Sequence, residues 1–197
     1  EDIFIEVSHG PTLVDNNILL SDHAMKLPTQ GVALVHNFIA GSFTAVGRGV
    51  DNGTPTKFSP RYTPYHMHHR TEVAGFMTIL HGDCRFYNNI FVQQKMRKGL
   101  VALQEQWKND EWSDGNLTVG TIPYEAYPTY EEYVTQFEGY CGMGSKKTDR
   151  YYNPLPVWAA GNAFFNGAKA MTKETDALVD NDHEVTVVLV EKDGEYT

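Results

Sequence analysis

The sequence contains little cysteine, little positive charge and no long apolar run. Its two cysteines, Cys84 and Cys141, are too few for a disulfide framework or a thiolate zinc site, and they leave only a single bridge open. Lysine and arginine total 16 against 25 aspartate and glutamate residues, so the formal net charge is −9. No apolar stretch reaches the roughly 18 residues that span a bilayer. We therefore expect neither a nucleic-acid partner nor a membrane partner.

The composition that remains is that of an ordinary globular protein. Of the 197 residues, 41% are hydrophobic and 21% are charged, which excludes disorder and collagen-like order. The chain begins without methionine and ends soon after a Lys192-Asp193-Gly194 turn, a signal that typically leads into a partner strand. We therefore expect a fragment of a longer protein. Cytoplasmic and periplasmic or secreted locations in a bacterium both remain open.

Four stretches of the chain place asparagine beside a short apolar run. They cover residues 14–20, 34–40, 86–92 and 160–166. Asn17 and Asn37 are 20 residues apart, a spacing typical of a solenoid in which each coil adds one strand to a parallel sheet. Equivalent asparagines can then stack as a hydrogen-bonded amide ladder. The alternative is that asparagine only marks turns between strands.

The region between the third and fourth repeats is rich in charge and tyrosine. Leu100, Leu103 and Trp107 recur at helical spacing, and Thr129-x-x-Glu132 is typical of a capping box, so we expect two short helices there. We predict β-helix coils over residues 1–92, a mainly covering insertion over 93–155, a final coil over 156–181 and the start of a sheet domain over 182–197. The last assignment depends on a β-rich run from residue 184 to 192.

The densest polar cluster extends from Arg61 to Glu72 and is followed by His81-Gly82-Asp83-Cys84-Arg85. In an extended strand, His66 and His68 would share one face, with Glu72 or Asp83 as further ligands of zinc or iron. The spacing matches no strong helical zinc motif, so we predict no metal ion.

A pair of carboxylates is the second interpretation of this region. Asp51 and Glu72 are 21 residues apart, close to the interval between the first two asparagines, and can occupy equivalent positions on adjacent coils. Neighbouring strands lie about 4.7–4.9 Å apart, which approaches the roughly 5–5.5 Å between the carboxyl groups of a retaining glycosidase. One carboxylate would then attack the anomeric carbon, and the other would protonate the leaving oxygen.

Each carboxylate also has a structural explanation. The sequence Asp51-Asn52-Gly53 is equally typical of a turn, and Glu72 can be the ion-pair partner of Arg70. Asp83 competes for a catalytic place, although it is only 11 residues from Glu72 and a charge pair with Arg85 would explain it.

The sequence resembles the family 120 glycoside hydrolases. The resemblance is carried by His9 to Ser21, Val35-His36-Asn37, Arg61 to His66, Thr71 to Gly75 and Gly82 to Phe91, and it covers about residues 1–92 and 156–180. It implies an all-β fold, a right-handed parallel β-helix carrying a β-sandwich. It also implies hydrolysis of β-xylosides with retention, through an Asp nucleophile and a Glu acid/base.

The resulting hypothesis is an exo-glycosidase that releases xylose from β-xylosides and short xylo-oligosaccharides, as in xylan degradation. Asp51 or Asp83 is the candidate nucleophile, and Glu72 is the candidate acid/base. The candidate sugar contacts are His36, Tyr62, His66, His69, Arg70 and Arg85. The hypothesis names an oligosaccharide partner, requires no cofactor and leaves a homo-oligomer open.

Two alternatives keep the same fold class. One is a polysaccharide lyase or epimerase in which a basic residue such as Arg70 abstracts a proton beside a uronate carboxylate. The other is a non-catalytic carbohydrate-binding β-helix, in which Asp51 and Glu72 are ordinary surface groups.

Overall fold

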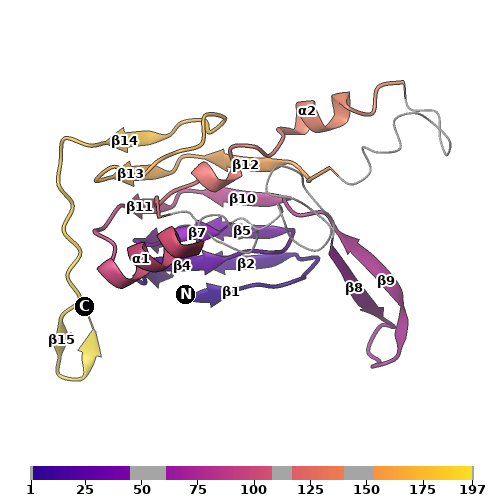
Figure 1. Cartoon of the computed structure of the whole chain (residues 1–197), viewed down its shortest axis with the longest axis horizontal. Helices are drawn as coiled ribbons and strands as arrows, with labels where there is room; N and C mark the ends of the chain where they lie inside the picture. The colour runs from indigo at the N-terminus through magenta and orange to yellow at the C-terminus, as the bar shows by residue number, and fades with distance from the viewer. Residues whose placement is uncertain (1, 45–60, 108–116, 140–152, 197) are drawn as a thin grey trace.

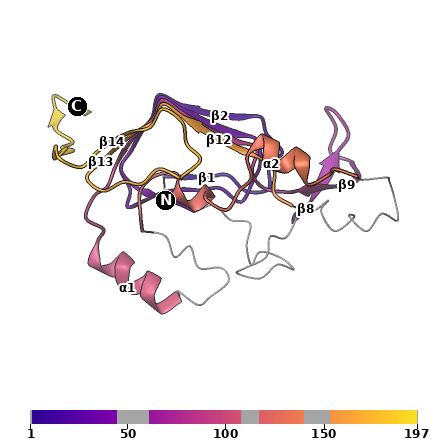
Figure 2. The ribbon, with the colours of Figure 1, turned by 90° about the horizontal axis from the view of Figure 1, so that it is seen from above.

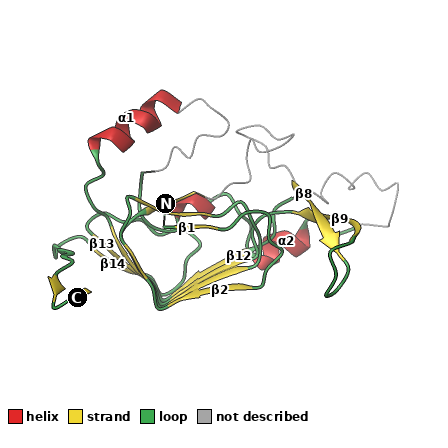
Figure 3. Cartoon of the chain, turned by 90° about the horizontal axis from the view of Figure 1, so that it is seen from below, coloured by secondary structure: helices red, strands yellow, loops and turns green. Residues whose placement is uncertain are grey.

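A computed structural model describes residues 2–44, 61–107, 117–139 and 153–196, and its fold is mostly β (Figures 1 and 3). Within this part of the chain, three parallel sheets form the body of the molecule. We name them sheets A, B and C. Figure 2 shows sheets B and C meeting at an angle, with β1 of sheet A on the opposite side.

The three sheets are built from short strands. Sheet A contains β1 (Ile3–Phe4), β4 (His23–Lys26) and β7 (Ser42–Thr44). Sheet B contains β2 (Thr12–Asp15), β5 (Val32–Val35), β10 (Cys84–Tyr87) and β12 (Val157–Ala160). Sheet C contains β3 (Ile18–Leu19), β6 (Phe38–Ile39), β11 (Ile90–Val92), β13 (Ala163–Phe165) and β14 (Leu178–Asp180).

The chain visits the sheets in a repeated order. It passes from β2 to β3 and β4, then from β5 to β6 and β7, so each of these two circuits contributes one strand to each sheet. Strands of successive circuits pair in parallel, with Thr12 opposite Val32 and Ile18 opposite Phe38. The predicted pairing of strands 20 residues apart is confirmed.

The four repeated asparagines form a continuous amide ladder where the chain passes from sheet B to sheet C. The Asn37 Oδ1 atom accepts from the backbone N and Nδ2 of Asn17, at 3.0 and 3.1 Å. Asn89 Oδ1 accepts in the same way from Asn37, and Asn162 Oδ1 from Asn89. Asn37, Asn89 and Asn162 are buried, and their Nδ2 groups also donate to backbone carbonyls of the strands. The predicted ladder is therefore present.

One residue before each ladder asparagine turns the chain. Asn16, His36, Asn88 and Gly161 occupy this position, and all four have positive φ, between 54° and 66°. Glycine and asparagine tolerate this left-handed conformation best. The backbone therefore bends sharply at the same point of each circuit, which aligns the ladder amides.

Inward-facing side chains of the three sheets form the core. Along β5 and β10, buried and partly buried residues alternate, as expected for strands with one face inward. Phe91 stacks on Phe164 with ring centroids 5.0 Å apart, and Phe43 meets Phe91 edge to face at 5.7 Å. Tyr124 closes this core, with its ring 4.8 Å from that of Phe86.

The described residues between β11 and β12 include three short helical elements. They are α1 (Lys98–Trp107), the 3-10 helix η1 (Ile122–Tyr124) and α2 (Tyr130–Thr135). Thr129 caps α2, and the predicted capping box with Glu132 is present. Tyr124 is buried in the core, so η1 covers one side of the sheets. The predicted domain boundaries themselves remain predictions.

The C-terminal segment differs from the strand expected over residues 184–192. Only Glu191–Lys192 (β15) forms a strand there, and it pairs antiparallel with β16 (Glu195–Tyr196) around the predicted turn. Val188, Leu189 and Val190 are exposed. A β-rich sequence forms a strand only when another strand pairs with it, and residues 184–190 belong to none of the sheets in the described part of the chain.

None of the helices in the described ranges is long and apolar enough to cross a membrane.

Removing a buried ladder amide should destabilise the fold far more than removing the amide at the end. Asn89→Ala deprives the Asn37 backbone N–H and the Leu34 carbonyl of their partners, so we expect a loss of about 3 kcal/mol in unfolding free energy. Asn17→Ala is the matched control and should cost about 1 kcal/mol. Urea unfolding of both variants tests this expectation, and equal losses would contradict it.

The ladder ends on a carboxylate whose protonation should set a pH dependence. Asn162 Nδ2 donates to Glu174 Oε1 at 2.6 Å, and Thr121 Oγ1 donates to Glu174 Oε2 at 2.9 Å. Burial nevertheless raises the pKa of Glu174 above its ordinary value of 4.5. Because the folded state binds this proton more tightly than the unfolded state, the cost of burying the charge is complete above the folded-state pKa and disappears as pH falls through it.

Glu174→Gln should therefore gain stability relative to wild type as pH rises. The substitution also changes the bond to Thr121, so a constant offset is expected and the pH-dependent part is the readout. Urea unfolding between pH 4 and pH 8 measures the difference. A difference that is flat over this range would contradict the burial argument.

Candidate functional site

The candidate site residues in the described chain fall into two groups. One group lies on an antiparallel hairpin, β8 (Arg61–His66) and β9 (Val73–Ile79), which we call the arm. The other lies on sheet B, around β10. Figures 1 and 2 show the arm projecting away from the three sheets.

The tip of the arm holds Glu72 in a tight polar contact. Arg70 donates to both Glu72 carboxylate oxygens, from Nη2 at 2.6 Å and from Nε at 3.2 Å. His66 Nδ1 lies 3.0 Å from the Thr71 carbonyl, and the rings of His68 and His69 are 4.0 Å apart. At the tip, Glu72 therefore contacts Arg70, His66 contacts the Thr71 backbone and His69 contacts His68.

Glu72 is ionised and exposed in this arrangement. The hydrogen bond from Arg70 holds the pKa of Glu72 below its ordinary value, and 55% of the side chain is exposed. A general acid must carry a proton at neutral pH, which normally needs burial or a nearby negative charge. The arm alone therefore presents a carboxylate, the state of a base.

Sheet B carries the second group, in which Asp83 and Arg85 form an ion pair. Arg85 Nη1 donates to Asp83 Oδ1 at 2.8 Å and to its carbonyl at 3.0 Å. The Arg85 guanidinium also lies 4.4 Å from the centre of the Trp158 ring on β12. The alternative explanation of Asp83 as an ion-pair partner of Arg85 is thus observed.

His36 belongs to the same sheet group. It is exposed at the bend that follows β5, and its Nε2 lies 3.5 Å from Asn88 Nδ2 on the next circuit. Tyr87 on β10 directly precedes Asn88 and pairs with Val35, the neighbour of His36. Asp83 and His36 therefore lie at opposite ends of the strands of sheet B, with Arg85 on the strand between them.

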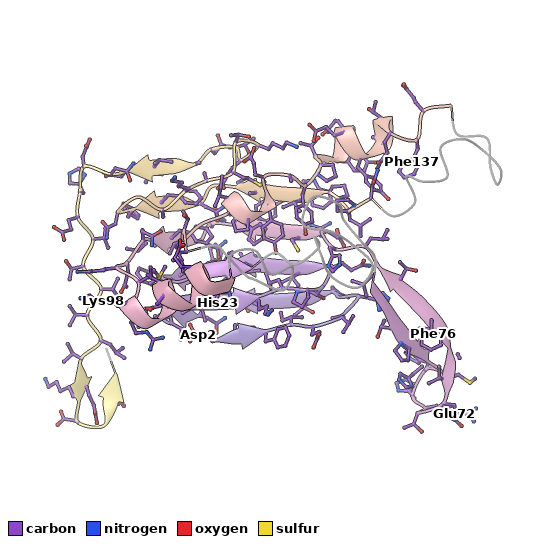
Figure 4. All side chains as sticks on the ribbon, in the orientation of Figure 1. Asp2, His23, Glu72, Phe76, Lys98 and Phe137 are labelled. Carbon is purple, nitrogen blue, oxygen red and sulfur yellow. The ribbon has the colours of Figure 1, made fainter. Side chains whose placement is uncertain are left out.

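The two groups are too far apart to share one sugar. β9 separates Glu72 from the base of the arm, and its seven residues span about 23 Å at 3.3 Å per residue. The base is anchored to the sheets, since Leu80 N donates to Gln30 Oε1 and Gly82 bridges to Gln30. Figure 4 labels Glu72 at the far end of the arm. Asp83 and Glu72 of one chain therefore do not approach the roughly 5–5.5 Å of a retaining pair.

Two of the predicted site residues lie wholly or partly outside the described residues. Asp51 lies outside the described residues, and so does the side chain of Tyr62, whose backbone pairs with Thr78 near the base of the arm. The 21-residue spacing from Asp51 predicted that Glu72 lies on a coil of the parallel sheets, and this prediction is wrong. This residue lies in a hairpin connection inserted between circuits and not on a strand of the parallel sheets.

Cys84 and the histidine cluster do not form a chemical centre in the described chain. Burial raises the pKa of the Cys84 thiol to about 12, so it stays protonated. Cys84 is a free thiol, and Cys141 lies outside the described residues. No group of three or more His, Cys, Asp and Glu side chains in the described part of the chain can hold a metal ion.

Sequence reasoning missed two aromatic residues and one hollow. Trp158 and Tyr87 lie beside the predicted residues of sheet B, and the signal for both was the strand alternation that sends them outward. An open hollow of about 560 Å³ lies between residues 93–95 and 181–187, and none of the predicted site residues lines it.

The chain is similar to the solved structure of XylC in complex with xylose. The two share 34% sequence identity, and they superpose with a TM-score of 0.68 over 98% of this chain and 25% of the XylC chain. This chain therefore spans about a quarter of the length of the protein it resembles. No family model and no curated protein matches it.

Arg70 should control the ionisation of Glu72. Replacing Arg70 with Gln removes the charged donor, so the pKa of Glu72 should rise toward its ordinary value of 4.5. Side-chain carboxyl titration by NMR measures this shift. Arg97→Gln is the control, because Arg97 pairs with Asp22 and should leave Glu72 unchanged. An unchanged Glu72 in the Arg70 variant would show that the ion pair does not form in solution.

Proposed function

We propose that this chain is part of a retaining β-xylosidase of the family 120 glycoside hydrolases. The observation that carries the proposal is the likeness to XylC in complex with xylose, which extends over 98% of the chain at 34% identity. The motifs from His9 to Phe91 that resemble the family support the same conclusion. The substrates proposed are β-xylosides and short xylo-oligosaccharides.

The proposed fold of the longer protein is a right-handed parallel β-helix with an appended β-sandwich. The parallel pairing of successive circuits and the amide ladder support the helix. The exposed apolar segment from Val188 to Val190 supports a continuation into a further sheet, because such a segment gains stability when a neighbour covers it.

The proposed chemistry uses Asp51 as nucleophile and Glu72 as acid/base. The Asp51 carboxylate attacks the anomeric carbon while Glu72 donates its proton to the glycosidic oxygen, which leaves as an alcohol. A glycosyl ester of Asp51 results. The Glu72 carboxylate then takes a proton from water, whose oxygen displaces Asp51 and releases xylose with retained configuration.

This role for Glu72 requires the arm to be covered. Apolar side chains stand exposed on both faces of the arm, among them Tyr65 on one face and Phe76, 72% exposed, on the other. Covering them removes water from the tip, which raises the pKa of a carboxyl group. Glu72 would then exchange its Arg70 partner for the glycosidic oxygen, and Arg70, His66 and His69 would bind hydroxyl groups.

Asp51 is the better candidate for the nucleophile. Asp83 is held by Arg85 and remains with the sheets, about 23 Å along β9 from Glu72. The length of the arm therefore argues that the nucleophile next to Glu72 is a residue other than Asp83.

The non-catalytic alternative has one observation in its favour. The Arg70–Glu72 ion pair satisfies Glu72 without any substrate, as expected for an ordinary surface carboxylate. The same ion pair argues against Arg70 as the base of a lyase, because a guanidinium bound to a carboxylate keeps its proton.

The test is hydrolysis of p-nitrophenyl β-xyloside by the longer parent protein. We expect cleavage by wild type and a loss of at least about 1,000-fold in Asp51→Asn, because the covalent step then lacks its nucleophile. Azide should rescue this variant and yield the inverted glycosyl azide. Glu72→Gln should be impaired chiefly for substrates with poor leaving groups.

Asp83→Asn is the matched control, and we expect it to retain cleavage. Loss of cleavage with azide rescue in Asp83→Asn, and not in Asp51→Asn, would reverse the assignment. No cleavage by wild type, with activity on uronides, would support the lyase; sugar binding that survives loss of Asp51 and Glu72 would support a binding protein.

A further inference from the structure

We propose a second sugar-binding site, separate from Glu72, on the outer face of sheet B. It consists of Trp158, Arg85, Tyr87, Asn88 and His36, which we call the sheet B strip. Its ligand is a neutral oligosaccharide whose pyranose rings stack on the two aromatic side chains. The choice of xylo-oligosaccharide rests on the proposed function, whereas the strip rests on its own contacts.

Strand alternation directs the members of the strip to one face. On β10, Cys84 and Phe86 are buried, so Arg85 and Tyr87 point outward. On β12, Trp158 is likewise outward between buried neighbours, and it lies directly opposite Arg85. Adjacent parallel strands are about 4.8 Å apart, so Trp158 and Tyr87 stand on neighbouring strands, two residues out of register.

Small side chains stand beside part of the strip. Arg85 lies opposite Ala33 on its other side, and Tyr87 lies opposite Ala160. Tyr87 therefore rises above Ala160, whereas Trp158 stands beside Arg85, whose guanidinium lies over its ring. Aromatic side chains with an apolar face and a polar edge bind ligands that are apolar on one side and polar at the rim, which is the surface of a pyranose ring.

Arg85, the charged member of the strip, is held in place before any ligand binds. Both hydrogen bonds from Arg85 to Asp83 use Nη1, so the Nε and Nη2 groups remain for a ligand, and 41% of the side chain is exposed. Stacking on Trp158 fixes the plane of the guanidinium. A donor fixed in advance loses little entropy on binding.

The bend supplies polar groups at the other end of the strip. His36 and Asn88 are exposed, 3.5 Å apart and positioned by left-handed residues beside the amide ladder. The neighbouring Asn37 and Asn89 are buried and hydrogen-bonded on both sides, so these loops have a rigid base. An imidazole and an amide provide both donors and acceptors for sugar hydroxyls.

The experiment is isothermal titration of the 197-residue chain with xylohexaose, with maltohexaose as the control sugar. Tryptophan fluorescence follows the same titration. We expect xylohexaose to bind, and Trp158→Ala and Tyr87→Ala each to weaken binding by at least about fivefold, a typical contribution of one aromatic contact. Trp158→Leu keeps an apolar side chain under Arg85 and should lose the same affinity, which separates stacking from folding.

Phe4→Ala is the matched control variant. Phe4 is 49% exposed on sheet A, with Lys26 Nζ 5.8 Å from its ring centre, so it reproduces an exposed aromatic beside a cation away from the strip. It should bind xylohexaose as wild type does. No binding by wild type, or equal binding by Trp158→Leu, would overturn the proposal, and so would self-association that disappears in Trp158→Leu without sugar binding.

The two proposals fail separately. Trp158-dependent binding of xylohexaose, without hydrolysis of the aryl xyloside by the parent protein, would support the sheet B strip and contradict the proposed xylosidase activity. Hydrolysis of the aryl xyloside without Trp158-dependent binding would contradict only the proposed sugar-binding role of the sheet B strip.

Discussion

The amide ladder is the interaction on which the rest of the structure depends. Asn37, Asn89 and Asn162 are buried, and their side chains donate and accept hydrogen bonds where the chain leaves one sheet for the next. A buried backbone bend would otherwise leave polar groups without partners, at a cost of about 1–3 kcal/mol for each group. The ladder removes this cost and fixes the register of successive circuits, so outward side chains line up across strands.

The same register explains why the candidate site residues fall into two groups, one on sheet B and one on the arm. Residues that precede the ladder asparagines, such as His36 and Asn88, are held close to the sheets by the repeating bend. The arm interrupts this repeat with an antiparallel pair that has its own geometry, and it carries Glu72 far from the bend. A two-stranded hairpin with apolar side chains on both faces is marginally stable in water. Its conformation therefore depends on whatever covers it.

Electrostatics follow from these positions. Glu72, on the exposed arm, is held as a carboxylate by Arg70, whereas Glu174, at the end of the ladder, has a raised pKa because it is buried. The pKa values of the two glutamates thus shift in opposite directions because of where the fold places them. A carboxylate on the arm and a stacked arginine on sheet B give the two surfaces different chemistry, which is why we assign bond cleavage to one and sugar stacking to the other.

The repeat, the ladder and the capped helix α2 could be predicted from the sequence, because each depends on residues at a regular or short spacing. Asn17 and Asn37 show the circuit length directly, and Thr129 with Glu132 forms its cap within one turn. The pairing of carboxylates could not be predicted, because spacing does not reveal whether residues such as Glu72 lie on a coil or on an inserted hairpin. Only the tertiary structure placed Glu72 on the arm, through the pairing of β8 with β9, and Trp158 beside Arg85, through the pairing of two strands distant in the chain, since a sequence pattern does not show which strands pair.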